Sequence, residues 1–137
     1  MYHKHIKAYT TQNLQAEMAV ADPYRVIQLM MQGCIERVAQ AKGAIERKDF
    51  ENKSIAISKS MALINGLQDA LDLSYGKVPE DLFALYDYMK QRLLDSSRNM
   101  DVAPLDEVSK LMLTIKSGWD AIPEEERKQV LANKVAI

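Results

Sequence analysis

The 137-residue sequence holds one cysteine and two histidines, and these small numbers exclude several kinds of site. Cys34 has no second cysteine with which to form an internal disulfide, and its apolar neighbours predict a small buried hydrophobe. His3 and His5 precede the helical patterns, so the helices lack both the Glu-x-x-His pairs of a di-iron bundle and the exposed histidine of a phosphotransfer bundle. We therefore assign no metal and no cofactor.

Sequence signatures of catalysis are missing as well. The chain contains no Gly-rich phosphate loop, no Gly-x-Ser-x-Gly elbow and no Cys-x-x-Cys pair, and its acidic residues are spread over polar helix faces. Because no residue is a candidate for a catalytic role, we expect a protein that is not an enzyme.

Long apolar runs and a strong charge imbalance are also absent. The longest uncharged apolar run falls far short of the ~20 residues that cross a bilayer, so we expect no membrane insertion. Residues 1–7 lack the apolar region of a secretory signal, which predicts a cytoplasmic location. The formal net charge of −1 gives no general attraction to phosphate backbones, so we expect no nucleic-acid partner.

Four stretches of the sequence have the periodicity of amphipathic helices, and no stretch alternates as a strand does. Asp22-Pro23 predicts the start of the first helix, because aspartate accepts from free backbone amides and proline needs no partner in the first turn. Gly76 should close the second helix and Pro123 should stop the fourth. The expected helices cover residues 23–47, 49–73, 79–99 and 104–122.

Short joints between these helices favour an all-α fold, an antiparallel up-down-up-down four-helix bundle formed by residues 22–122. Gly33 and Gly43 lie inside the first helix, where close backbone packing would offset their low helix propensity. Before the bundle, residues 1–21 are expected to form a mobile N-terminal arm or cap. After it, residues 123–137 should form a short fifth helix and a tail.

The helices carry more apolar side chains than the bundle interior needs. On the second helix, a line of apolar or small residues that includes Gly66 lies roughly opposite the main seam, where a surface helix ordinarily shows charge. Similar outlying residues recur on the third and fourth helices, which indicates a binding surface, although any one of them alone would be ordinary surface. The predicted partner-binding residues are Ile55, Ala62, Leu73, Phe83, Tyr88, Leu94 and Leu113.

An apolar groove on a helical bundle suits an amphipathic helix supplied by another chain. A partner that is disordered before binding loses ~2–5 kcal/mol to ordering and recovers it by covering a large area. The sequence therefore favours a binding module.

The third predicted helix contains Asp81-Leu82, Leu85-Tyr86-Asp87-Tyr88-Met89 and Arg92-Leu93. This sequence resembles the FliS family of flagellin-specific export chaperones. The resemblance extends over most of the chain, to Asp22-Pro23, the turn from Leu71 to Gly76, and Glu107-Val108 with Trp119. The chain departs from the family's typical sequence at Met31, where tyrosine is typical, and at Ser96-Ser97, where Ala-Asn is common.

The resemblance implies a cytoplasmic chaperone that binds the disordered C-terminal region of flagellin, prevents premature polymerisation and assists export. A flagellar export gate would be a further partner, and the free protein would be a monomer or a weak dimer. In such proteins the N-terminal arm covers part of the binding surface, and Ile6 and Tyr9 are the matching apolar positions here.

Two other classes of function remain open at this point. The protein could be a helical regulatory adaptor that sequesters a signalling or anti-sigma protein through the same surface. It could also be a structural bundle that self-associates through its outlying apolar residues. Binding to flagellin with and without its tail separates the first alternative from the chaperone, and light scattering across a concentration series tests the second.

Overall fold

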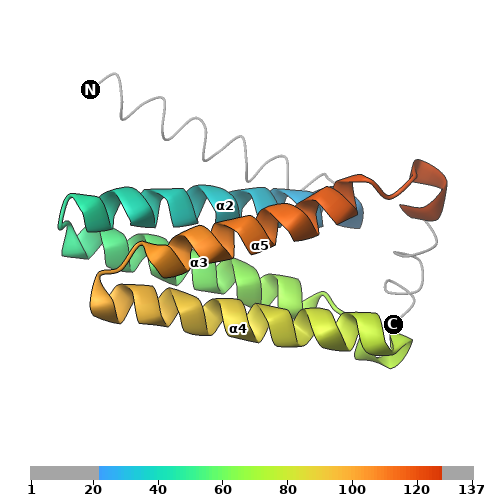
Figure 1. Cartoon of the computed structure of the whole chain (residues 1–137). Coiled ribbons are helices and arrows are strands. Elements are labelled where there is room, and N and C mark those ends of the chain that lie inside the picture. Colours follow the sequence, from blue (N-terminus) through green and yellow to red (C-terminus); the bar gives the residue numbers. More distant parts are fainter. Residues whose placement is uncertain (1–21, 128–137) are drawn as a thin grey trace, which may run out of the picture.

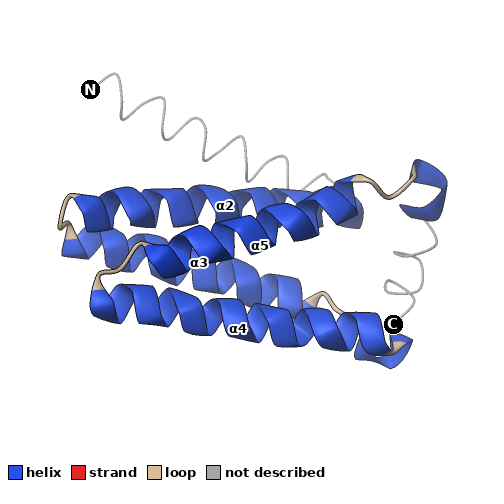
Figure 2. Ribbon diagram, in the orientation of Figure 1, coloured by secondary structure: helices blue, strands red, loops and turns tan. Residues whose placement is uncertain are grey.

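The computed structural model describes residues 22–127, which form a bundle of four long antiparallel helices (Figure 1, Figure 2). A short 3₁₀ helix, η1 (Leu73–Tyr75), lies between the second and third long helices, and residues 124–127 begin a further helical turn. No strand occurs among the residues described, so the predicted all-α bundle is confirmed. The long helices are α2 (Pro23–Glu46), α3 (Phe50–Asp69), α4 (Lys77–Asn99) and α5 (Ala103–Asp120).

The four helices form a closed ring in chain order. Close backbone approaches join α2 to α3, α3 to α4, α4 to α5 and α5 back to α2, whereas the backbones of the diagonal pairs stay farther apart. Lys53 of α3 donates to the carbonyl oxygen of Ser97 on α4 at 3.0 Å, and Gln68 donates to Asp87 at 2.8 Å. Residue numbers therefore fall along α4 as they rise along α3, which is the up-down arrangement expected from the short joints.

The start of α2 follows the sequence prediction. The Asp22 carboxylate accepts from the backbone amide of Arg25 at 2.8 Å, and Pro23 occupies the first turn, where its missing amide hydrogen has no consequence. The helix ends at Glu46, one residue before the expected boundary.

The joint between α3 and α4 differs from the prediction. α3 ends at Asp69 rather than at residue 73, because the Asp72 carboxylate accepts from the backbone amide of Ser74 at 3.0 Å and organises η1. Gly76, with φ 105° and ψ −143°, precedes α4 instead of closing α3. α4 begins two residues before Pro79, since proline is tolerated within the first turn of a helix.

The interior is apolar and receives side chains from all four helices. Cys34 lies in this interior with no exposed surface, and burial raises the pKa of its thiol to about 12. The predicted role of Cys34 as a small buried hydrophobe is thus confirmed. The largest fully buried side chains include Ile64, Leu67, Tyr86, Met89, Leu93, Leu105 and Met112.

The contact between α2 and α3, here called the α2–α3 seam, is close because glycines leave room for neighbouring side chains. A Cβ atom built on Gly33 would lie 3.3 Å from the Leu63 Cδ1 atom, and one on Gly66 would overlap the Met30 methyl group. The prediction of close packing was right for Gly33 and wrong for Gly43, whose only near neighbour is Arg47 of the same helix. Gly66, assigned from sequence to an outer line, instead lies against α2.

The contact between α5 and α2 is fixed at one end by two aromatic rings. Tyr24 and Trp119 stack with ring centroids 5.1 Å apart. Each also binds the other's backbone: the Tyr24 hydroxyl donates to the Trp119 carbonyl at 2.8 Å, and the Trp119 indole donates to the Tyr24 carbonyl at 3.1 Å. This reciprocal pair satisfies both polar groups while the rings remain packed.

Candidate functional site

The predicted partner-binding residues differ in exposure from the interior of the bundle. Five of the large ones have exposed fractions between 37% and 49%, namely Ile55, Leu73, Tyr88, Leu94 and Leu113. Ala62 is also exposed. Phe83 is only partly buried, and its backbone carbonyl accepts from Gln68 at 3.0 Å.

These residues do not converge on a single groove. Ile55 and Ala62 are seven residues apart on α3 and so lie on one line of that helix, away from its buried face. On α5, Leu113 is seven residues, or about two turns, from both Asp106 and Asp120, so the three share one face. Asp106 accepts from Lys42 of α2 at 2.9 Å, and Asp120 accepts from Gln28 of α2 at 2.6 Å. Leu113 therefore lies on the side of α5 that faces α2. The exposed apolar side chains are distributed around the bundle.

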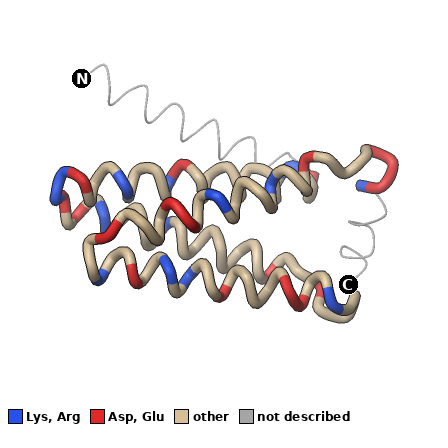
Figure 3. Tube along the Cα trace, in the orientation of Figure 1, with Lys and Arg blue, Asp and Glu red and all other residues tan. Residues whose placement is uncertain are grey.

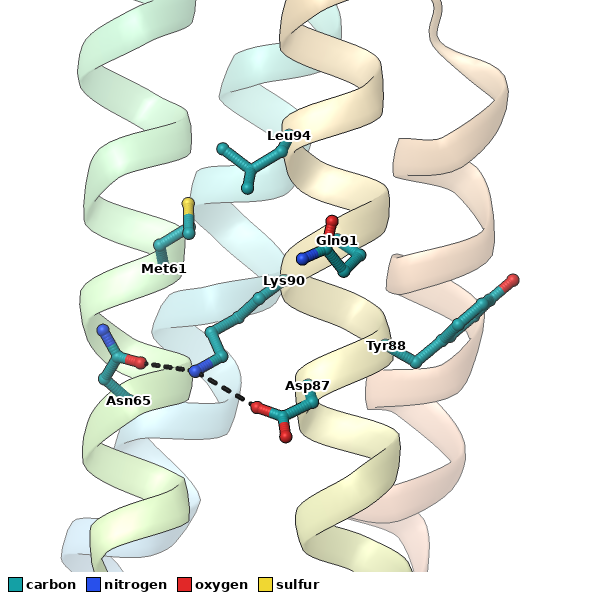
Figure 4. A pocket seen from close by; sticks show the side chains of 7 residues that line it. All are labelled: Met61, Asn65, Asp87, Tyr88, Lys90, Gln91 and Leu94. Carbon is teal, nitrogen blue, oxygen red and sulfur yellow. Dashed lines mark hydrogen bonds and ion pairs between the residues drawn. The ribbon is translucent and has the colours of Figure 1, made fainter.

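A shallow hollow of about 500 Å³ lies between α3 and α4 (Figure 4). Met61 and Leu94 supply its apolar part. In its polar part, the Lys90 ammonium donates to the Asn65 side-chain oxygen at 2.9 Å and pairs with the Asp87 carboxylate at 3.4 Å. The hollow thus offers an apolar contact beside a fixed polar group, which is a common combination for binding a side chain of another protein.

The polar part of this hollow is held in place by Gln68, a buried residue of α3. Its amide donates to the Asp87 carboxylate at 2.8 Å as well as to the Phe83 carbonyl. The hydrogen bond from Gln68, together with the nearby Lys90, lowers the pKa of Asp87. Asp87 is therefore ionised at neutral pH and fixed in orientation.

Tyr88 extends away from the hollow toward α5 (Figure 4). Its hydroxyl donates to the Glu107 carboxylate at 2.7 Å, and the Arg92 guanidinium donates to the same oxygen at 2.7 Å. The hydrogen bond from Tyr88, followed by that from Arg92, lowers the pKa of Glu107. Because the hydroxyl is engaged, the exposed part of Tyr88 is available for an apolar contact.

Charged residues of both signs are interspersed along the helices, so the apolar positions are not bordered by a field of one sign (Figure 3). Within residues 22–127 no group of three metal-ligating side chains occurs. In the same range, no helix combines the length and apolar character that a membrane crossing requires.

Three exposed apolar residues were not predicted from sequence. Phe50 is 62% exposed at the start of α3, while Tyr75 and Val78 are 57% and 78% exposed near Leu73. All three lie in or beside joints, where the periodicity of a helix gives no information about which side chains face outward. The joint between α3 and α4 therefore presents an apolar surface at one end of the bundle.

Comparison with known proteins gives a consistent result. The sequence profile of the family described as Flagellar protein FliS matches residues 5–126. The flagellar secretion chaperone FliSB of Pseudomonas aeruginosa is 45% identical over 120 residues, covering 87% of this chain and 95% of that protein. The flagellar secretion chaperone FliS of Vibrio cholerae is 30% identical over 88% of this chain and 89% of that protein. Its counterpart in Salmonella typhimurium is 32% identical over 85% of this chain and 88% of that protein.

These relatives are named as flagellar secretion chaperones, in agreement with the prediction of a protein that is not an enzyme. The profile match covers most of the chain and extends from the segment before α2 to the turn that follows α5. The resemblance recognised in the sequence of α4 is therefore confirmed, and the chain belongs to the FliS family.

Proposed function

We propose that this protein is a flagellar secretion chaperone that binds the disordered C-terminal region of flagellin in the cytoplasm. Membership of the FliS family supports the chaperone role in flagellar export. The observation that carries the proposal is the set of exposed apolar side chains on a bundle whose interior is already filled. They stand on α3, η1, α4 and α5, as a long client wound around the helices would require.

A client of this kind gains affinity from the extent of its contact. Ordering a disordered segment uses ~2–5 kcal/mol of the interaction energy, so the segment must bury on the order of 1,000–3,000 Å². Separated contacts at Ile55, Leu94 and Leu113 suit a segment that wraps better than they suit a compact partner. While wrapped, the flagellin segment cannot polymerise, and the complex can be delivered to the flagellar export gate.

The proposal includes a cover for part of this surface in the free protein. Ile6 and Tyr9 lie outside the described residues, and we assign to them the role of an N-terminal cap that flagellin displaces. The free protein is then a monomer or a weak dimer. Deleting residues 1–12 should strengthen flagellin binding or speed its association, and unchanged or weakened binding would contradict the cap.

Titration calorimetry with flagellin and with flagellin lacking its C-terminal region tests the client. Full-length flagellin should bind and truncated flagellin should not, because the C-terminal region of flagellin alone makes the proposed contacts. Equal affinity for both would remove the tail-binding mechanism and favour a regulatory adaptor that uses the same surface.

The substitution Ile55→Glu tests the surface. It should weaken flagellin binding by more than about 1 kcal/mol, roughly fivefold in Kd, because a charge replaces an apolar contact. Gln40→Glu introduces the same charge at an exposed polar position of α2, a helix that carries none of the predicted partner-binding residues, and serves as the matched control. Equal effects of the two substitutions would remove Ile55 from the binding surface, and thermal unfolding checks that both variants remain folded.

A further inference from the structure

One line of apolar side chains remains partly exposed although it points toward the interior. We call it the α4–α5 strip. Arg92 and Glu107 fix the register of the two helices, and moving eight residues along α5 and eight residues back along α4 brings Ile115 level with Ala84, which lies between Leu82 and Leu85. The strip therefore lines one end of the contact between the helices. Its members are Leu82 and Leu85 of α4, together with Leu111, Ile115, Trp119 and Ile122 from α5 and the turn after it.

The remainder of the same contact is closed. Met89 and Leu93 on α4, and Leu105 and Val108 on α5, have no exposed surface. Toward the strip the exposure rises, and Val78, one turn before Leu82, is 78% exposed. Apolar surface that is left open at one end of a well-packed core indicates a place where another segment docks.

The described chain ends beside this strip. The Arg127 guanidinium lies 4.1 Å from the centre of the Tyr24 ring, which itself stacks on Trp119. The Arg127 Nε atom also donates to the Ile122 carbonyl at 2.9 Å. Residue 127 is thus anchored at the edge of the strip, with its side chain directed toward the bundle.

The sequence after Arg127 is amphipathic in the same register. If the helical turn at 124–127 continues, positions three, four and eight residues after Arg127 share its face, and they hold Val130, Leu131 and Val135. The opposite face holds Gln129 and Asn133.

The ten residues 128–137 are also long enough to cover the strip. As a helix they would extend about 15 Å, more than the 8–10 Å that typically separates the axes of packed helices. The exposed Asp81 borders the strip immediately before Leu82, and residues 128–137 carry two lysines and no acidic residue, so the charges of the two segments are complementary.

We propose that residues 128–137 dock on the α4–α5 strip and are the segment that covers it. Val130, Leu131 and Val135 cover Leu82, Ile115 and Trp119. This assignment concerns the chain's own C-terminal segment and does not depend on the identity of the client.

Trp119 is the single tryptophan and lies in the strip, so its fluorescence reports on the cover directly. In the full-length protein without flagellin, Leu131→Asp should increase acrylamide quenching of Trp119 roughly twofold, because loss of local packing exposes the indole to solvent. Asn133→Asp adds the same charge on the opposite face and should leave the quenching unchanged. Circular dichroism checks that the bundle remains folded in both.

Hydrogen exchange gives a second readout that does not involve the tryptophan. Deleting residues 128–137 should increase exchange in residues 80–86 of α4 while leaving α2 and α3 unaffected. Equal quenching in the two point variants would overturn the proposal. Greater exposure of Trp119 on deletion of residues 1–12 but not of 128–137 would assign the strip to the N-terminal segment instead. Quenching that falls with protein concentration would assign it to a second copy of the chain.

Discussion

The α2–α3 seam and the α4–α5 contact join neighbouring antiparallel helices by different means. In the seam, Gly33 and Gly66 let the large side chains Leu63 and Met30 pack against the opposite helix. Between α4 and α5, a hydrogen-bonded surface group centred on Glu107 connects the helices, and the apolar strip beside it remains partly exposed. The comparison teaches that one side of this bundle is completed by the contact of two helices, while the other leaves apolar surface on which a further segment can dock.

Truncating a leucine in α3 and one in the α4–α5 strip should give the largest difference in the free energy of unfolding. Leu67→Ala in α3 removes a side chain that is 2% exposed and should lower the free energy of unfolding by about 3 kcal/mol. Leu82→Ala in the strip should lower it by about 1 kcal/mol, because less surface is buried there. Urea unfolding measures both, and equal losses would mean that the strip is as tightly packed as the seam.

The chain has one cysteine and one tryptophan, and these two residues report on local unfolding in different parts of the bundle. Cys34 is a fully buried residue of α2, and its raised pKa makes it unreactive while it is buried. Trp119 belongs to the strip. As urea increases, quenching of Trp119 should rise before Cys34 becomes reactive toward a thiol reagent, with opening near Trp119 at least about 1 kcal/mol less costly than global unfolding. Simultaneous changes at both sites would show that the bundle opens as one unit.

Glycine substitutions test the closeness of the seam. Gly43→Ala should raise stability by about 0.5–1 kcal/mol, because alanine is the better helix former and only the mobile Arg47 side chain lies nearby. Gly33→Ala brings the same gain in propensity, but its new methyl group presses on Leu63, so the net gain should be smaller or negative. Identical thermal stabilities for the two variants would contradict the tight contact.

The smallest expected effect concerns the polar group between α4 and α5. Hydrogen bonds from Tyr88 and Arg92 lower the pKa of Glu107, so they favour the folded state at pH values above the carboxyl's usual pKa. This contribution is lost as the pH falls through the lowered value. Glu107→Gln should therefore reduce stability at neutral pH, and the deficit should shrink below about pH 4. Unfolding curves across this range measure it, and a deficit independent of pH would exclude the ionised contact.

Much of the fold could be predicted from local sequence signals. The Asp22-Pro23 cap and the periodicity of the helices located α2 and α5 closely, because both features act within a few residues. The end of α3 was misplaced because the Asp72 side chain competes for backbone amides, which helix periodicity does not register. The role of Gly66 was missed because it depends on Met30 of another helix.

The candidate surface was only partly predictable for a similar reason. Outlying apolar positions on long helices, such as Ile55 and Leu113, could be found from their angle relative to the main seam. Val78 lies at a helix start, where that angle carries no information about burial. The α4–α5 strip was missed because its residues have the pattern of an interior face, and only the packing of two helices reveals that this face is incompletely covered.

The arrangement of the joints also determines how the protein can be immobilised. The turns at 47–49 and 100–102 lie at one end of the bundle, whereas Asp22 and Arg127 lie at the other (Figure 1). A thiol introduced by Lys48→Cys would react selectively with a maleimide surface, since Cys34 is enclosed. A sensor chip coated in this way would present every molecule in one orientation, with the origins of both terminal segments directed into the flowing solution.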